Sequence, residues 1–151
     1  MGWCQTAKSS FWKHGSFDEF VGLKEGYWCV IRDSRAMITL EIYYQSGDEG
    51  RLKEIKTELS RQRRLLGFHG LSIINGRITL LFFGWGLLFQ SKTEKLKRAL
   101  EAMPKLLISC GVEPSAVCGC GSKDQLKCYK GSDTKVRVLC AECATKADSL
   151  F

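Results

Sequence analysis

Five of the chain's eight cysteines fall within one C-terminal segment, VCGCGSKDQLKCYKGSDTKVRVLCAEC. Cys118 and Cys120 are separated by one residue, and Cys140 and Cys143 form a C-x2-C pair after a gap of 19 residues. Two thiolate pairs at this spacing are typical ligands of one tetrahedral metal ion, because each loop supplies two sulfur atoms. The pattern therefore predicts a metal site made from these four cysteines.

The residues between the two pairs predict a β-hairpin that brings the pairs together. The segment LKCYKGSDTKVRVL has strand-like residues on both sides of a turn near residues 130–133. Residues 117–146 thereby resemble the zinc-ribbon family, and the resemblance implies a structural zinc ion held by Cys118, Cys120, Cys140 and Cys143. The usual first loop of that family is C-x2-C, whereas here it is C-x-C. Either both sulfur atoms still reach the metal, or Cys128 substitutes for one of them.

Other roles for the cysteines stay open at this point. A strand that leads into C-x-x-C is also typical of thiol oxidoreductases, in which Cys140 and Cys143 would form the redox pair. Such a pair is normally followed by a full helix, and only eight residues follow Cys143. Disulfides would need an oxidising compartment, which nothing in the sequence indicates. Cys29 and Cys110 lie in apolar surroundings and are predicted to be small core residues, as is Cys128 if the first loop is intact.

The sequence lacks the residue combinations that most catalytic sites need. It contains no H-E-x-x-H, G-x-S-x-G, P-loop or G-x-G-x-x-G motif, and its two histidines, His14 and His69, are far apart. No acid and base are visibly paired for proton transfer. The sequence therefore favours a binding or regulatory module over an enzyme, and it indicates no small-molecule substrate.

The positive charge of the chain favours a polyanionic partner. The formal net charge is +7, which attracts nucleic acid or anionic surfaces. On the predicted hairpin, basic side chains that could neutralise phosphates accompany an aromatic ring that could stack on a base: Lys127, Tyr129, Lys130, Lys135 and Arg137. Further basic clusters at residues 61–64 and 92–98 are interpreted as solvated helix faces. The sequence leaves the partner undecided between a protein and a nucleic acid.

Three S-x-x-E capping boxes predict three helices before the cysteine segment. The first would cover residues 17–24 after Ser16. The second would open at the box Ser46–Glu49, with Leu52, Ile55, Leu59 and Leu66 at helical spacing. The third would cover residues 92–103 after Ser91, with a kink or an end at Pro104. Between the helices, residues 27–32 and 38–44 predict one strand pair, and residues 71–83 predict a hairpin with a type I′ turn at Asn75–Gly76.

This order of elements predicts an α+β fold. We expect an antiparallel sheet of two hairpins with helices on one face, in the order ββαββα, compatible with a ferredoxin-like variant, followed by the zinc ribbon. The predicted boundaries are an N-terminal tail over residues 1–15, an α+β domain over 16–111 and a zinc-ribbon module over 112–151. The segment GVEPSAV would link the last two.

The sequence also predicts a compartment. The N-terminus has no continuous apolar region typical of a secretory signal, so we expect a cytoplasmic, reducing location in which thiols stay free for metal. The most apolar stretch, residues 78–89, is too short to span a bilayer. Met1-Gly2-Trp3-Cys4 loosely fits a lipidation pattern. An alternative is therefore the soluble cytosolic part of a larger, membrane-associated protein.

Overall fold

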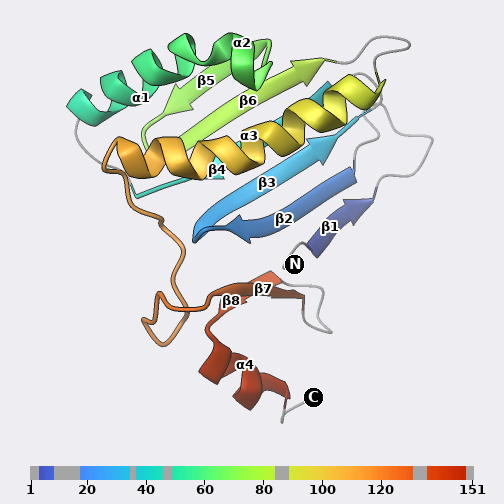
Figure 1. Ribbon diagram of the computed structural model, residues 1–151. Helices are drawn as coiled ribbons and strands as arrows, with labels where there is room; N and C mark the ends of the chain where they lie inside the picture. The colour runs from blue at the N-terminus through green and yellow to red at the C-terminus, as the bar shows by residue number, and fades with distance from the viewer. Residues whose placement is uncertain are drawn as a thin grey trace.

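The computed structural model describes residues 4–8, 18–34, 37–45, 49–83, 89–130 and 136–148. Six strands form one antiparallel sheet in the order β1-β2-β3-β4-β6-β5 (Figure 1). The strands are β1 (Cys4–Lys8), β2 (Asp18–Lys24), β3 (Tyr27–Asp33), β4 (Met37–Tyr43), β5 (Gly70–Ile74) and β6 (Arg77–Phe83).

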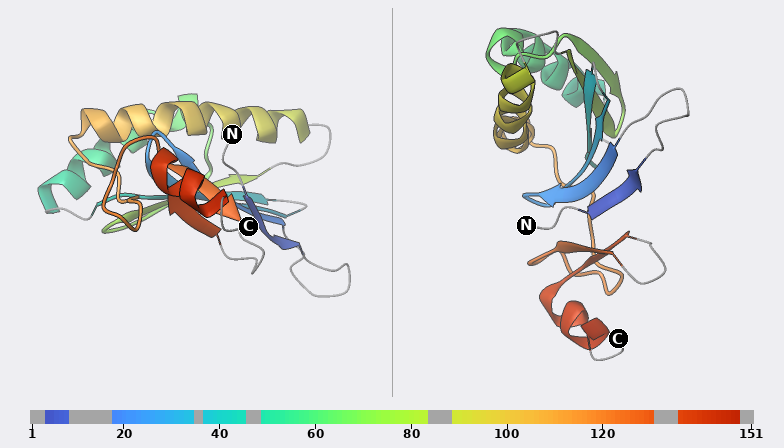
Figure 2. Two further views of the ribbon diagram at one scale, coloured as in Figure 1. Left: turned by 90° about the horizontal axis from the view of Figure 1, so that it is seen from below. Right: turned by 90° about the vertical axis from the view of Figure 1, so that its right-hand side faces the viewer.

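Helices α1 (Glu49–Arg61), α2 (Arg63–Leu66) and α3 (Phe89–Ser109) cover one face of this sheet (Figures 1 and 2). The strand residues that face the helices alternate with residues on the open face, as the two-residue period of a strand requires. Both sides of the interface contribute side chains with no exposed surface, including Leu40, Ile42, Leu80 and Phe82 from the strands and Ile55, Leu59, Met103 and Leu107 from the helices. The α+β class with helices on one face is confirmed.

Residues 18–24 form strand β2, so the predicted first helix is wrong. The β2 strand pairs along its whole length with β3, from Asp18 opposite Asp33 to Lys24 opposite Tyr27. The two-residue turn between them, Glu25–Gly26, has φ values of 51° and 84°, which is the backbone of a type I′ turn. This turn holds β2 against β3, and sheet pairing then outweighs the helical spacing of the apolar residues. Ser16 lies outside the described residues.

The strand pairs at 27–44 and 71–83 form as predicted, with one correction to the turn chemistry. Asn75–Gly76 joins β5 to β6, and Gly76 has a φ of 94°. Asn75 does not share the positive φ that a type I′ turn requires at both central residues. The type I′ turn of this sheet is therefore at Glu25–Gly26.

The topology differs from the predicted two hairpins. Strands β1 to β4 form a continuous meander, and β6 then joins β4 with β5 at the far edge. All five neighbouring pairs are antiparallel, so the sheet lacks the parallel pair that a βαβ crossover of a ferredoxin-like fold would create. The difference arises because residues 4–8 and 18–24 add two strands in front of the predicted first pair.

Helix α3 is longer than predicted at both ends. It begins at Phe89, so Ser91 is not its N-cap, and it continues through Pro104 to Ser109. Pro104 is itself fully buried, and Met103, Leu106 and Leu107 beside it are core residues. Their burial outweighs the single backbone hydrogen bond that proline removes. The second predicted helix is divided in two, because α1 ends at Arg61 and the separate α2 continues from Arg63 to Leu66. Ser46 lies outside the described residues.

Residues 115–148, which we call the cysteine module, lie at the β1–β2 side of the sheet (Figure 1). The module contains a two-stranded sheet of β7 (Lys127–Lys130) and β8 (Val136–Leu139), followed by helix α4 (Ala141–Asp148). Strand β7 contacts β1 and β2. The segment that leads into the module runs along the main sheet. Tyr27 Oη donates a hydrogen bond to the carbonyl of Val112, and the amide of Gln45 donates one to the carbonyl of Glu113. The domain boundaries themselves stay a prediction.

Candidate metal centre

The fold brings together the four cysteines of the two predicted pairs. Cys118 and Cys120 lie in the loop before β7, Cys140 directly follows β8, and Cys143 is in α4. Their Sγ atoms all lie within 4.8 Å of one another. The β7–β8 hairpin is responsible, because it returns the chain from the first pair to the second. Four thiol groups this close can hold a metal ion.

A tight turn lets the C-x-C pair place both sulfur atoms on the same side. The amide of Gly121 donates to the carbonyl of Cys118 at 2.8 Å, and the amide of Cys118 donates to the carbonyl of Ser122 at 2.9 Å. Gly121 has a φ of 92°, a conformation that residues with a side chain rarely adopt. The loop therefore turns sharply around Cys120, and the missing residue of the usual first loop does not separate the sulfur atoms.

The second pair sits at the start of a helix instead of in a second open loop. Cys140 precedes α4, where its carbonyl accepts from the amide of Ala144 at 2.9 Å and its Sγ accepts from the amide of Cys143 at 3.5 Å. This is the arrangement of an N-cap residue, with sulfur in the place of the usual side-chain oxygen. Amides at a helix N-terminus favour negative charge, and α4 directs an amide of its first turn toward the sulfur of Cys140.

The thiol groups of the cluster do not ionise independently. Hydrogen bonds from the backbone amides of Cys120 and then Cys140 lower the pKa of Cys118 to about 6. Hydrogen bonds with the side chains of Cys120, Cys118 and Cys140 raise the pKa of Cys143 to about 12. The opposite directions follow from crowding, because each thiolate that forms makes the next less favourable. A bound cation would offset the charges of several thiolates in this space.

The other described cysteines lie outside this cluster. Cys128 is buried in β7 and is not among the four. Cys29 is fully buried in the main core, and burial raises the pKa of its thiol to about 12. Cys110 is half-buried near the end of α3, and burial again raises its pKa. These three are consistent with the predicted core thiols.

The register of the β7–β8 hairpin shows which of the residues predicted to contact a polyanion share one face. Tyr129 lies directly opposite Arg137, and Lys127 is two residues before Tyr129, so these three occupy one face of the hairpin. Cys128 alternates with these residues along β7 and is buried on the other face. The side chain of Lys130 and all of Lys135 lie outside the described residues, so their part in polyanion contact stays a prediction. We call Lys127, Tyr129 and Arg137 the hairpin face.

The basic residues of the helices are engaged with the fold. Arg63 donates to the carbonyl of His69 at 2.8 Å, and Arg98 donates to the carbonyl of Leu65 at 3.0 Å. Arg61 pairs with Glu58 at 2.6 Å. The first two contacts join α2 to the residue before β5 and α3 to α2, whereas the Arg61–Glu58 pair lies within α1.

A polar network on the open face of the sheet was not predicted. Arg32 pairs with Glu19 at 2.8 Å and with Glu41 at 2.5 Å, and Tyr43 Oη donates to Glu41 at 2.7 Å. Glu41 is the buried member of the network, and its charge is compensated by these partners. The alternation in residues 38–44 already placed Glu41 and Tyr43 opposite the apolar face, but their partners on β2 and β3 depend on the strand order.

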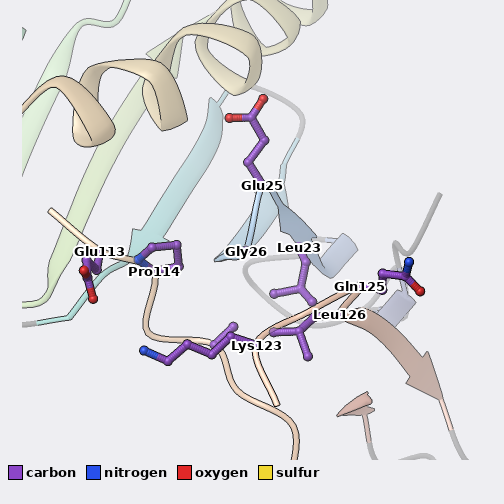
Figure 3. Close-up of a pocket in the computed structure, with 9 residues that line it drawn as sticks. Leu23, Glu25, Gly26, Glu113, Pro114, Lys123, Gln125 and Leu126 are labelled. Carbon is purple, nitrogen blue, oxygen red and sulfur yellow. The ribbon is translucent and has the colours of Figure 1, made fainter. Parts of the chain in front are cut away.

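A cavity of about 640 Å³ lies where the cysteine module meets the sheet (Figure 3). Its lining comes from the β2–β3 turn, the linker at residues 113–116 and the loop at residues 123–126. Leu23 and Leu126 point toward one another across it (Figure 3). Gly26 at its wall packs against Pro114, since a Cβ at this glycine would lie 3.2 Å from the proline ring. The lining is mixed in character, because Glu25, Glu113, Lys123 and Gln125 accompany the apolar residues.

Comparisons of the chain with protein-family models, with curated proteins and with solved structures found no match. Among the described residues, no helix is both long enough and apolar enough to cross a membrane. The function of the chain is therefore inferred from the residues of the site and their geometry.

Proposed function

We propose that this chain is a non-enzymatic binding module whose C-terminal part is held together by one structural zinc ion. The observation that carries the proposal is the set of four cysteine Sγ atoms within 4.8 Å of one another. Tetrahedral zinc with Zn–S bonds of about 2.3 Å separates its sulfur ligands by roughly 3.8 Å. The Sγ atoms of Cys120 and Cys140 are 3.8 Å apart. Sulfur-only ligand sets in this geometry favour zinc over oxygen-preferring cations.

The donor set supports a structural role for the metal. Four protein ligands complete a tetrahedral site and leave no position for a substrate or an activated water molecule. Cys118 and Cys140 are buried and Cys143 is half-buried, whereas Cys120 lies at the surface. A redox role for Cys140 and Cys143 is less well supported, because two further thiols crowd the same space.

For the partner we propose a single-stranded nucleic acid, bound at the hairpin face. Lys127 and Arg137 are exposed on either side of half-exposed Tyr129. Basic side chains can neutralise phosphates, and an aromatic ring between them can stack on a base. Three such groups on one side of a hairpin support this partner over a protein, which would favour an apolar patch.

Metal analysis tests the zinc proposal. Protein purified under reducing conditions should contain one zinc ion per chain, and Cys140→Ser should lose it because three sulfur ligands remain. Cys128→Ser is the matched control, since Cys128 is also buried in the module but lies outside the cluster. Zinc-free wild-type protein, a disulfide between Cys140 and Cys143, or equal zinc loss in both variants would contradict the proposal.

Titration of labelled single-stranded DNA and RNA at two salt concentrations tests the partner. Log affinity should fall with log salt with a slope of about −0.7 per neutralised phosphate. Tyr129→Ala should cost roughly 1–3 kcal/mol of binding free energy if a base stacks there, and Lys127→Glu should weaken binding to all sequences alike. Lys53→Glu on α1, another exposed lysine, should change binding much less. Absence of salt-sensitive binding would leave a protein as the partner.

A further inference from the structure

The two edges of the six-stranded sheet differ in how they are protected. An unprotected edge exposes backbone groups that can pair with another chain, and proteins usually block it with charges, prolines, bulges or a covering element. The β1 edge has a register irregularity between Gln5 and Ala7 and contacts β7 of the cysteine module. In the described part of the chain, β5 has a neighbouring strand on one side only. Its sequence GLSII contains neither charge nor proline, and its register with β6 is continuous.

The side chains of β5 are left incompletely covered at this edge. Leu71 and Ile73 are half-buried and pack against the main core. On the open face, Ser72 is exposed and Ile74 keeps 54% of its surface exposed. An uncharged edge strand with a large exposed aliphatic residue is suited to pairing with another strand.

We propose that β5 pairs antiparallel with β5 of a second copy of this chain, about a two-fold axis at Ser72. The axis sets Ser72 opposite itself, Leu71 opposite Ile73 of the second copy, and Gly70 opposite Ile74 of the second copy. Two six-stranded sheets then become one continuous sheet, and the β1 edges with their cysteine modules lie at its two ends. Such an interface is isologous, because one surface supplies both sides.

On the helix side, this register extends the core. Leu80 of β6 lies opposite Leu71 of β5, and Ile78 lies opposite Ile73. The row across the new interface therefore reads Leu80, Leu71, and then Ile73 and Ile78 of the second copy. All four positions are apolar, so pairing buries the exposed parts of Leu71 and Ile73 against similar side chains.

On the open face, the same register joins hydroxyl groups and adds an apolar contact. Thr79 lies opposite Ser72, so the central row becomes threonine, serine, serine and threonine, a favourable cross-strand combination. Leu81 lies opposite Gly70 and leans over it, since a Cβ at this glycine would be 2.7 Å from Leu81 Cδ1. Ile74 of the second copy would lie on the other side of Gly70 and contact Leu81.

This complementarity favours a second copy over an unrelated strand. Leu81, which leans over Gly70, provides an apolar surface on one copy, and exposed Ile74 provides the side chain that meets it on the other. Because of the two-fold symmetry, this contact forms twice in the dimer. The inference does not depend on the zinc site or on nucleic-acid binding.

Sedimentation equilibrium of the zinc-loaded full chain over a range of concentrations tests the proposal. The wild type should show a monomer–dimer equilibrium, and Ile74→Lys should raise the dissociation constant of the dimer at least tenfold. Ile108→Lys is the matched control, because Ile108 is 57% exposed on α3, away from this edge, and it should leave the equilibrium unchanged. A monomeric wild type at every concentration, or equal weakening by both variants, would overturn the proposal.

Cross-linking tests the register directly. Residues directly opposite each other in antiparallel strands have Cβ atoms about 4.5–5.5 Å apart, near the range that a disulfide bridges. Under mild oxidation, Ser72→Cys should form a covalent dimer in much higher yield than the wild type or Lys105→Cys, an exposed position on α3. Equal yields in the three proteins would show that β5 does not face a second β5.

Discussion

The main sheet and the cysteine module differ in the kinds of side chain that they bury. The sheet and its helices share one core of large apolar side chains, including Tyr27, Leu40, Phe82 and Leu107. Among the described residues of the module, the buried ones are Cys118, Cys128, Cys140 and Ala144. A short segment that buries mainly thiol groups cannot offset its loss of conformational entropy by apolar burial. The sheet can therefore fold by the hydrophobic effect, whereas the proposed zinc ion would supply the folding energy of the module.

Removal of the proposed zinc ion should produce the largest difference in stability between the two regions. A strong chelator should unfold residues 115–148 and leave the main sheet folded, because free energy of metal binding supplies the folding energy of such modules. Amide hydrogen exchange should show protection lost in β7, β8 and α4 and retained in β3, β4 and β6. Protection lost together in both regions would show that they form a single cooperative unit.

A cavity in the main core should give the next largest effect. Phe82→Ala removes a fully buried ring and should lower the free energy of unfolding of the sheet by about 3–5 kcal/mol. The neighbouring Phe83 is 37% exposed, so Phe83→Ala should cost much less in the same denaturant titration. Zinc content should stay the same in both folded variants, and coupled loss of zinc from Phe82→Ala would contradict independent folding.

Backbone strain in a turn of the sheet should have a smaller effect. Gly76 has a φ of 94°, so Gly76→Val should lower the melting temperature of the sheet by the equivalent of roughly 1–3 kcal/mol. Gly119 in the module lacks a positive φ, and a Cβ there would meet nothing within 4 Å, so Gly119→Ala is the control. An unchanged melting temperature in Gly76→Val would mean that the β5–β6 turn can relax without cost.

The weakest predicted effect concerns the contact between the two regions. Leu126 is half-buried and points toward Leu23 across the cavity at the junction (Figure 3). Leu126→Ala should cost about 1 kcal/mol and should increase hydrogen exchange in β7 without loss of zinc. Val117→Ala, at a residue that is 46% exposed in the same module, should leave exchange in β7 unchanged. Identical exchange in the two variants would show that the junction contributes no stability.

Local patterns predicted the parts of the fold that depend on neighbouring residues. The alternation in residues 38–44, the turn at Asn75–Gly76 and the apolar spacing after Glu49 each predicted the correct element, because strand and helix periods are read over a few residues. Residues 17–24 were predicted wrongly because a short apolar stretch fits both periods. There the type I′ turn at Glu25–Gly26 and the pairing with β3 decided the outcome, and a capping-box match alone could not reveal them.

The sequence by itself determined the four clustered cysteines, the hairpin between them and the α+β class, since thiol spacing and residue periodicity are local properties. Tertiary structure alone decided three further features. It placed the second cysteine pair at the start of α4, it assembled Glu19, Arg32 and Glu41 across three strands, and in the described part of the chain it left β5 as an edge strand. The physical reason is common to all three. Each depends on which strands become neighbours, and that order is set by the burial of one shared core and not by any single segment.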